Sequence, residues 1–301
     1  MLGMGIIMQK LRSNKLSNAV MIAILSVISV LTLLPLLYLL SVSFSTDAGI
    51  VKYGYTLIPK SFTLEGYSFI FRVPKPIITG YLVSITVTVL GTVLGLALSS
   101  TLAYVMARKD YRYSKQTSFY VFFTMLFNGG LVPTYIVMTK LLHVQDTIWG
   151  LVIPYSISPW FTMIMKGFME TLPFEIVESA KIDGAGEFKT FIRIILPVAK
   201  PAIATVGLFY AFAYWNDWWL AMLYISKESL IPLQFLLYRT LSNLSYILNN
   251  MSSLLNVNMS NIPSESVRMG MAVIAAGPML ILFPFFQKHF VKGLTVGSVK
   301  G

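Results

Sequence analysis

The sequence has no cysteine and little charge. Its 301 residues also include only two histidines. These absences exclude a disulfide framework, a thiolate metal site and a histidine-rich metal cluster. Only 12% of the residues are charged and 56% are hydrophobic, whereas soluble domains carry about twice that charged fraction. The composition therefore predicts a polytopic, all-α membrane protein rather than soluble domains.

Sequence features for ATP binding and for catalysis are also missing. The chain has no G-x-x-x-x-G-K-[ST] pattern, because Lys60-Ser61 and Lys189-Thr190 lack the preceding glycines. The acidic residues of Glu175–Pro201 have no histidine or cysteine beside them, so no nucleophile–base pair is visible. We expect no catalytic residue, no metal and no cofactor in this chain.

Long apolar runs predict six transmembrane helices, since a span needs about 20 mostly apolar residues. The runs are Ala19–Phe44, Gly80–Met106, Thr117–Leu142, Thr147–Phe168, Ala202–Ile225 and Val267–Phe290. The first run is too long for the hydrophobic region of a signal peptide, so we expect an uncleaved span. The loops Ser45–Thr79 and Ser226–Ser266 are long and partly apolar, which predicts short helices within them.

The positions of lysine and arginine predict the orientation. The net charge is +11, and cytoplasmic loops of membrane proteins carry an excess of these residues, so we interpret the charge as topology rather than nucleic-acid binding. With the N-terminus in the cytoplasm, most of the cations lie on that side. They are Lys10, Arg12, Lys15, Arg108, Lys109, Arg112, Lys115, Lys166, Lys181, Lys189, Arg193, Lys200, Lys288, Lys292 and Lys300. We therefore expect both termini and Glu175–Pro201 in the cytoplasm.

Glu175–Pro201 is a polar segment between two apolar runs. Pro173 fits the first turn of a helix, Asp183-Gly184 is a turn signal, and Gly186 can cap a second helix. The segment therefore predicts a helix–turn–helix that a soluble partner can bind. We expect Gly184 to be required because the turn leaves little room for a Cβ atom.

Apolar residues and prolines define the second helix of this segment. We expect one apolar face and an end at the prolines before the next span. The face consists of Phe188, Phe191, Ile192 and Ile195, and the prolines are Pro197 and Pro201.

The same segment resembles the EAA motif of ATP-binding-cassette importer permeases. That motif runs Glu-Ala-Ala, two residues, Asp-Gly-Ala, a spaced Phe, and Leu-Pro with a further Pro. The corresponding residues are Glu178, Ser179, Ala180, Asp183, Gly184, Ala185, Phe191, Leu196, Pro197 and Pro201. Ser179 stands where Ala is usual and Gly186 where Ser or Thr is common, and both are small substitutions.

The resemblance extends over nearly the whole chain. Phe290–Gly301 is similar to the C-terminus of maltose-type (MalG-like) carbohydrate permeases. "FNGGLVPTY" and "LFYAFAYWNDWWLAMLYI" resemble the subgroup often labelled LplC or YtcP. The resemblance implies a type I importer fold with a cytoplasmic N-terminus (1–18), a permease domain (19–292) and a cytoplasmic tail (293–301). Residues 173–201 would be its coupling segment.

The resemblance also implies a mechanism and partners. The coupling segment would insert into a groove on an ATPase subunit, with Glu178 forming an ion pair there and helping to hold the turn. A dimer of these ATPases would bind ATP and Mg²⁺ and drive alternating access. A second homologous permease chain would complete the pathway through the lipid bilayer of the bacterial cell membrane. An extracellular substrate-binding lipoprotein would deliver an oligosaccharide, and no nucleic acid is involved.

Polar and aromatic residues inside the apolar runs are candidates for the substrate pathway. Polar residues at membrane depth are costly and often functional, and aromatic rings stack on sugar faces. At helical spacing Tyr214 and Asp217 share one face, and Asn216 and Trp219 share another. The candidates are Asn128, Tyr135, Tyr214, Asn216, Asp217 and Trp219. An interfacial belt of aromatic residues explains the same pattern equally well.

Glycines in two of the spans carry structural predictions. Gly91 and Gly95 form a G-x-x-x-G pattern, which predicts close helix packing. In "NGGLVPTY", Asn128–Tyr135, two glycines and Pro133 predict a broken or kinked helix. That break either lines a cavity or serves packing alone.

Two other functions fit parts of the sequence. An ion-coupled secondary transporter would use an intramembrane carboxylate, for which Asp217 is the candidate. An ATP-binding-cassette permease for a solute other than a sugar would share the EAA motif.

Overall fold

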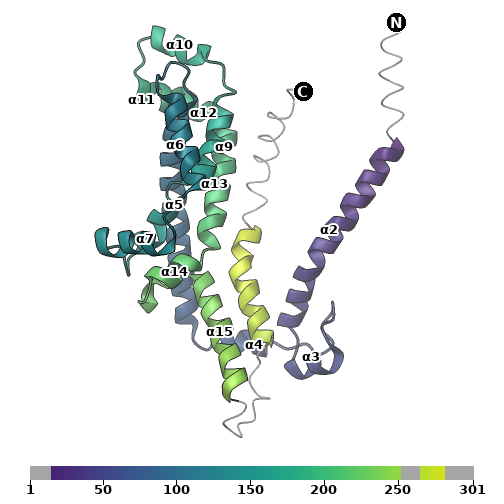
Figure 1. The fold of residues 1–301 in the computed structure, drawn as a ribbon. Coiled ribbons are helices and arrows are strands. Elements are labelled where there is room, and N and C mark those ends of the chain that lie inside the picture. Colours follow the sequence, from purple (N-terminus) through teal and green to yellow (C-terminus); the bar gives the residue numbers. More distant parts are fainter. Residues whose placement is uncertain (1–14, 252–264, 282–301) are drawn as a thin grey trace. The chain divides into compact units, whose positions relative to one another are not determined.

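A computed structural model gives the fold and describes residues 15–251 and 265–281 (Figure 1). These residues form helices joined by turns, and the described part contains no strand beyond an isolated bridge between Ser45 and Phe62. The chain divides into two compact units. One comprises Met1–Val73 and Leu244–Ile274, and the other Pro74–Asn243 and Ala275–Gly301.

The first unit contains α2 (Lys15–Ser43), α3 (Asp47–Tyr53) and α4 (Glu65–Ile70). The two short helices confirm the expectation for the loop after the first span. The Asp47 carboxylate accepts hydrogen bonds at 3.3 Å from the backbone N–H groups of Glu265 and Ser266. It thereby caps the helix over residues 265–281, whose remaining expected length to Phe290 lies outside the described residues.

The second unit is built around one long helix, α5, with shorter helices packed against it. Its elements before the coupling segment are α5 (Pro74–Ala107), α6 (Ser114–Leu126), α7 (Leu131–Ile136), the π-helical turn η1 (Val137–Leu141), α8 (Ile148–Val152), η2 (Ile153–Tyr155) and α9 (Pro159–Met169). The others are α10 (Glu175–Ile182), α11 (Glu187–Thr190), η3 (Phe191–Ile195), α12 (Leu196–Val198), α13 (Lys200–Trp215), α14 (Trp219–Tyr224), η4 (Glu228–Leu230) and α15 (Leu233–Met251), of which the residues from Leu244 on belong to the first unit.

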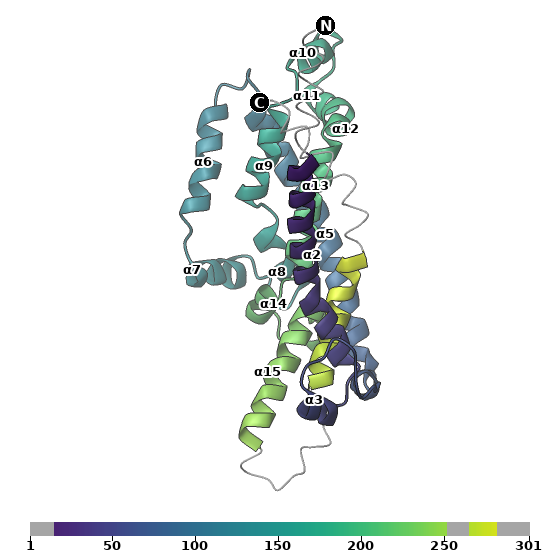
Figure 2. The same cartoon turned by 90° about the vertical axis from the view of Figure 1, so that its right-hand side faces the viewer.

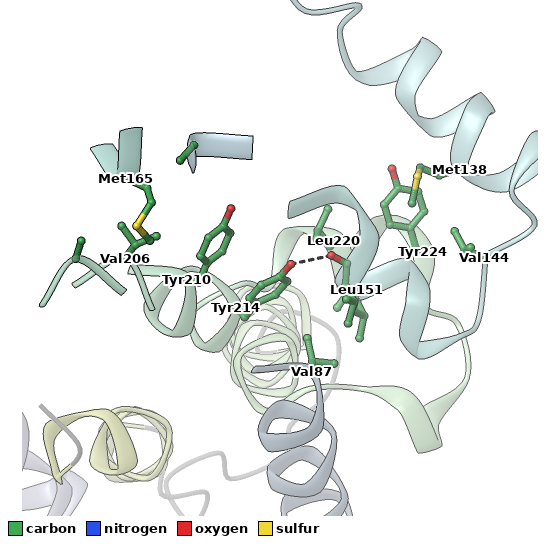
Figure 3. Packing of buried hydrophobic residues seen from close by; sticks show 14 of the residues in the cluster. Val87, Met138, Val144, Leu151, Met165, Val206, Tyr210, Tyr214, Leu220 and Tyr224 are labelled. Atoms are coloured by element: carbon green, nitrogen blue, oxygen red, sulfur yellow. Dashed lines mark hydrogen bonds between the residues drawn. The ribbon is translucent and has the colours of Figure 1, made fainter. Parts of the chain in front are cut away.

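Close packing between α5 and α13 forms the core of this unit. A Cβ atom added at Gly91 would overlap the Tyr214 ring, and one at Gly95 would lie 2.7 Å from the Tyr210 ring. The Tyr214 hydroxyl donates a hydrogen bond to the Val152 carbonyl at 2.8 Å (Figure 3). The packing prediction for the G-x-x-x-G pattern is confirmed, because the glycines make room for two buried tyrosines.

Some of the apolar runs form one unbroken helix, whereas others are interrupted. Asn18–Ser43 and Pro74–Ala107 are each long and apolar enough to cross a membrane. The third run is broken as predicted, since α6 and the α7–η1 helix meet at 108° (Figure 2). Gly130 has a φ of +83° at this break, whereas Pro133 lies in the first turn of α7. The glycines therefore make the break, and the proline starts the next helix.

The expectation of one continuous helix over Ala202–Ile225 is wrong. α13 ends at Trp215 and α14 begins at Trp219. The Asn216 side-chain amide donates to the Phe212 carbonyl at 3.0 Å, which closes α13. The Asp217 carboxylate accepts the Leu220 N–H at 3.0 Å, which starts α14. The polar pair thus ends one helix and starts another, so its side chains do not follow the faces of a single helix.

Candidate coupling site

The coupling segment folds as two helices around a tight turn, as predicted. α10 begins two residues after Pro173, and Gly186 is the N-cap residue of α11. Between them Gly184 has a φ of +72°. The Ala185 N–H donates to the Ala180 carbonyl at 2.9 Å, which closes the end of α10. Figure 1 shows α10 and α11 side by side at one end of the second unit.

The reason why glycine is needed at the turn differs from the expected one. A Cβ atom at Gly184 would meet nothing within 4 Å. The turn requires glycine because a φ of +72° is unfavourable for residues with a side chain. The Glu178 side chain makes no hydrogen bond or ion pair with any described residue, so backbone bonds hold the turn in this chain, and the role of Glu178 at a partner subunit stays a prediction.

The second helix ends at the prolines, as predicted, but is less amphipathic than predicted. It continues through Pro197 to Val198 and then bends by 83° into α13. Pro197 is tolerated because it directly follows the π-helical turn η3, where the regular α-helical bonding is already interrupted. Phe191 and Ile195 are buried, whereas the other two residues of the expected apolar face, Phe188 and Ile192, are 76% and 42% exposed.

Apolar side chains project from the turn. Ile182 is 86% exposed and Phe188 is 76% exposed, one on either side of Gly184. Of the residues that match the EAA motif, Glu178, Ser179, Asp183, Gly184 and Pro197 are exposed, Ala185, Leu196 and Pro201 are partly exposed, and Ala180 and Phe191 are buried. Exposed apolar residues beside a polar helix are typical of an interaction surface.

Five side chains join the coupling segment to the end of α5, and we call them the clasp. The clasp consists of Tyr104, Arg108, Asp110, Lys181 and Glu187. The Arg108 Nε donates to Asp110 at 2.6 Å, and its Nη2 donates to Glu187 at 3.1 Å. Its two remaining bonds to these carboxylates make both contacts bidentate. Such paired bonds fix both the distance and the orientation of the partners.

The clasp satisfies a buried charge. The Arg108 side chain is 9% exposed, and burying an unpaired guanidinium would be very costly. Besides the two carboxylates, Arg108 donates to the Tyr104 hydroxyl at 2.6 Å. The Lys181 ammonium donates to Asp110 at 2.6 Å and lies 3.4 Å from Glu187. Two cations and two carboxylates therefore balance one another where the helices meet.

Hydrogen bonds from the cations shift the acid–base equilibria of the clasp. Those from Arg108 hold the pKa of Asp110 well below its usual range, and Lys181 adds to this effect. Hydrogen bonds from Arg108 likewise lower the pKa of Glu187. Both carboxylates are thus ionised throughout the physiological pH range, and the clasp remains fully charged.

The clasp was not predicted from the sequence. Arg108 and Glu187 are 79 positions apart, and each alone is an ordinary charge beside a helix end. The signal that was available is a pair of cations followed by an acid, "RKD" at Arg108–Asp110, directly after a long apolar run. Charged residues in such a position can become buried where the end of another helix packs against them.

The substrate-pathway candidates are distributed between buried and exposed positions. Tyr214 is buried against α5, and Asp217 accepts a hydrogen bond from the Tyr155 hydroxyl at 3.0 Å. Asn216 is exposed and Trp219 is 40% exposed.

The other two candidates lie at and near the break in the third run. The Asn128 side chain accepts a bond from the Gly130 N–H at 2.9 Å. The Tyr135 ring stacks on that of Tyr224 at 5.8 Å. The structure thus brings together Tyr214 and Asp217, both of which approach Tyr155.

Residues 99–296 match the family described as "Binding-protein-dependent transport system inner membrane component". The chain belongs to this family. It is 40% identical to Protein LplC of Bacillus subtilis (strain 168) over 266 residues, which are 88% of each chain. It is 39% identical to the polygalacturonan/rhamnogalacturonan transport system permease protein YtcP of the same organism, over 88% of this chain and 91% of that one.

A solved structure agrees with this membership. It is a crystal structure of a bacterial ABC transporter involved in the import of the acidic polysaccharide alginate. The match has a TM-score of 0.77 and 27% identity and covers 93% of this chain and 98% of the other. The chain therefore has the fold of an ABC importer permease, lies in the bacterial cell membrane, and is a transport component rather than an enzyme.

Proposed function

We propose that this chain is a transmembrane subunit of an ATP-driven importer of oligosaccharides or polysaccharide fragments. Several relatives carry names of carbohydrate systems, among them YtcP and an arabinooligosaccharides permease, AraQ of Bacillus subtilis (strain 168), which is 28% identical over 81% of this chain. A second homologous permease chain, a dimer of ATPase subunits with ATP and Mg²⁺, and an extracellular substrate-binding lipoprotein complete the transporter.

The coupling segment carries this proposal. Its turn presents Ile182 and Phe188 to the surrounding medium, and neither is covered by a described residue. Two apolar side chains on a short turn fit a groove on a soluble subunit, where their burial stabilises the complex by about 2 kcal/mol each. Glu178, exposed one turn before Ile182, can then pair with a cation of that subunit.

The clasp gives the segment its mechanical role. A helix pair attached only by flexible loops would move without displacing the transmembrane helices. Here Arg108, at the end of α5, binds Glu187, the first residue of α11, and Lys181 near the end of α10 binds Asp110. Movement of the turn is therefore transmitted to the end of α5.

Helix α5 passes this movement to the interior. The Gly91 and Gly95 backbone lies against the Tyr214 and Tyr210 rings of α13. Packed interfaces of this kind shift between discrete arrangements rather than deform continuously. ATPase closure would thus change how α5 and α13 pack, and with it the access of the pathway to either side.

The topology that we propose for the chain has six membrane spans, with both termini in the cytoplasm. α2 and α5 supply two spans, and bent helix pairs supply up to three more among the described residues. One of these pairs joins Glu187–Val198 to α13 at 83°. We assign its first helix to the coupling segment, because Lys189 and Arg193 are exposed on it, and only α13 to the membrane.

For the substrate pathway we propose two different roles for the polar and aromatic residues at the break between α13 and α14. Asn216 and Trp219 have exposed side chains and are suited to contact a sugar through hydrogen bonds and stacking. Tyr214 and Asp217 hold the ends of α13 and α14 in place through Val152, Leu220 and Tyr155. Asn128 and Tyr135 would act near the break between α6 and α7.

Purification of the tagged full chain from native membranes, followed by mass spectrometry, tests the proposal. We expect a second permease with its own EAA motif and an ATPase to be present. The Gly184→Trp variant should keep the permease and lose the ATPase and uptake, since a bulky side chain at the turn blocks docking.

Gly54→Trp is the matched control for this experiment. Gly54 also has a positive φ, +70°, and open space where a Cβ atom would lie, but it belongs to the loop after the first span. It should retain the ATPase. Full ATPase retention by Gly184→Trp, or purification of the wild-type chain without any ATPase, would contradict the proposal.

A further inference from the structure

A basic hollow lies beside the clasp, at the junction of α5, α6 and α9, and we call it the basic groove. Its volume is about 850 Å³. Cations dominate its walls, and Glu170 is the only acidic residue in the described lining. The charged and hydroxyl residues of the lining are Arg108, Lys109, Arg112, Lys115, Lys166, Glu170, Tyr111, Ser114 and Ser118.

Three of these cations have no acidic partner in the part of the chain that the structure describes. Arg108 is bound in the clasp, and Lys166 forms an ion pair with Glu170 at 3.0 Å. Within residues 15–251 and 265–281, no ion pair involves Lys109, Arg112 or Lys115. The groove thus has an excess of three positive charges, to which the N-terminus of α6 at Ser114 adds a partial positive charge.

A buried hydroxyl in the groove also lacks a partner. The Ser118 Oγ atom has almost no solvent-accessible surface and no hydrogen-bond partner among the described residues. A buried polar atom of this kind usually has a partner that satisfies it. Rotation of the Ser118 side chain about its Cα–Cβ bond would bring this hydroxyl to the groove, where an oxygen-rich anion would supply an acceptor for it and negative charge for the three cations.

The apolar surroundings indicate what kind of anion fits. α6 leads away from the groove, and large apolar side chains on it are exposed. They are Phe119, Tyr120, Phe122, Phe123 and Leu126, with exposed fractions between 44% and 69%. A small soluble anion would leave this apolar surface uncovered, whereas the acyl chains of a lipid would cover it.

The position along α5 places the groove at headgroup depth. α5 has 34 residues, which at 1.5 Å per residue is about 51 Å, longer than a hydrocarbon core of about 30 Å. Its end at Ala107 therefore reaches the interface. Tyr111 and Tyr113, which contact each other edge to face at 6.1 Å, are typical of that depth.

We propose that the basic groove binds the phosphate headgroup of an anionic phospholipid, with the acyl chains along α6. Lys109, Arg112 and Lys115 bind the phosphate, and Ser118 donates a hydrogen bond to it. The assignment of this site to the cytoplasmic leaflet rests on the orientation given under Proposed function. Because the groove adjoins Arg108, a bound lipid would also hold the cytoplasmic ends of α5 and α6 together.

The test measures lipid binding to the purified full chain in neutral detergent by native mass spectrometry. Phosphatidylglycerol is the probe, and phosphatidylcholine is the zwitterionic comparison. The triple variant Lys109→Gln/Arg112→Gln/Lys115→Gln should bind phosphatidylglycerol at least about tenfold more weakly, because each cation near an anionic headgroup contributes appreciably. The triple variant Lys189→Gln/Arg193→Gln/Lys200→Gln removes the same charge from exposed positions elsewhere and should bind within twofold of wild type.

Two further arms keep the result decisive. Ser118→Ala leaves the charge unchanged and should weaken phosphatidylglycerol binding several-fold, which separates loss of the site from misfolding of a triple variant. Inorganic phosphate and glycerophosphoglycerol, at concentrations equal to that of the lipid, should not displace it. Equal losses in both triple variants, or displacement by either soluble phosphate, would overturn the lipid site. ATPase docking plays no part in this measurement, so its outcome is independent of the coupling proposal.

Discussion

The transmembrane core and the coupling segment use glycine for opposite reasons. In α5, Gly91 and Gly95 are required for space, since tyrosine rings occupy the positions where Cβ atoms would lie. At the turn, Gly184 is required for its backbone conformation, and the space around it is empty. The core is thus fixed by shape, whereas the coupling segment depends on its backbone conformation and on the charges of the clasp as well as on the burial of Phe191 and Ile195.

This difference shows how a small helix pair can be firmly attached and still present apolar residues. A segment anchored by packing alone would have to bury all its large side chains, whereas this one buries only some, such as Phe191 and Ile195. The clasp anchors α10 and α11 through directed ionic hydrogen bonds, so Ile182 and Phe188 remain available to a partner.

The largest effect on stability is expected in the core. Gly91→Ala would place a methyl group within the space of the Tyr214 ring, and overpacking of this kind costs about 1–3 kcal/mol. Thermal unfolding of the purified chain in detergent measures the loss. Gly167→Ala in α9 is the matched control, because a Cβ atom there meets nothing within 4 Å, and it should be neutral or slightly stabilising. Equal losses at the two glycines would remove shape as the basis of the core.

The next effect is loosening of the coupling segment. Arg108→Gln removes both bidentate contacts of the clasp and should make α10 and α11 more mobile. The chain has no cysteine, so a spin label attached through Phe188→Cys reports on this turn alone. We expect the fraction of mobile label to rise several-fold with Arg108→Gln and to stay unchanged with Arg193→Gln, an exposed cation of the same segment. An immobile label in the Arg108 variant would show that packing suffices.

A smaller effect is expected at the substrate pathway. Asp217→Asn keeps one acceptor oxygen, which can serve the Leu220 N–H, while its amide NH2 can donate to the Tyr155 hydroxyl oxygen, so the break between α13 and α14 should survive. Because the side chain loses its charge and one acceptor oxygen, the break is held less firmly, and we expect uptake of the native sugar to slow by a few-fold with unchanged assembly. Asp146→Asn is the control, because Asp146 also accepts backbone bonds, from Ser226 and Lys227, in an exposed turn. Identical uptake by Asp217→Asn and wild type would remove Asp217 from the pathway.

The smallest effect is that of pH near neutrality. Asp110 and Glu187 have lowered pKa values in the folded chain. Their contribution to stability is therefore complete above the ordinary carboxyl pKa of about 4 and is lost as the pH falls through the lowered values. The spin label at Phe188→Cys should show constant mobility from about pH 5 to 8 and rising mobility only below about pH 4. A transition near neutrality would mean that another group controls the clasp.

Local signals explain what could be predicted from the sequence. Pro173, Asp183-Gly184 and Gly186 act within a few residues, so the helix–turn–helix of the coupling segment was predicted correctly. The G-x-x-x-G pattern also has a local meaning, although its tyrosine partners on α13 could not be named. Pro197 and Pro201 also act locally, and the helix ends between them at Val198 as predicted, although the π-helical turn before Pro197 has no sequence signature.

Features that depend on distant contacts could not be predicted. The clasp joins residues from two regions far apart in the sequence, and only the fold brings Arg108 to Glu187. The break after Trp215 was missed because Asn216 and Asp217 were interpreted as functional polar residues inside a span. Their first role is to end one helix and start the next.

The account depends most directly on the transmission of force through the clasp. The decisive measurement is the number of sugar molecules imported per ATP hydrolysed, in proteoliposomes that contain the complete transporter with wild-type chain or with Arg108→Gln. We predict that the variant still hydrolyses ATP, because Ile182 and Phe188 remain exposed for docking, while import per ATP falls by about tenfold. An unchanged ratio, with the ATPase bound and the chain folded, would contradict the account.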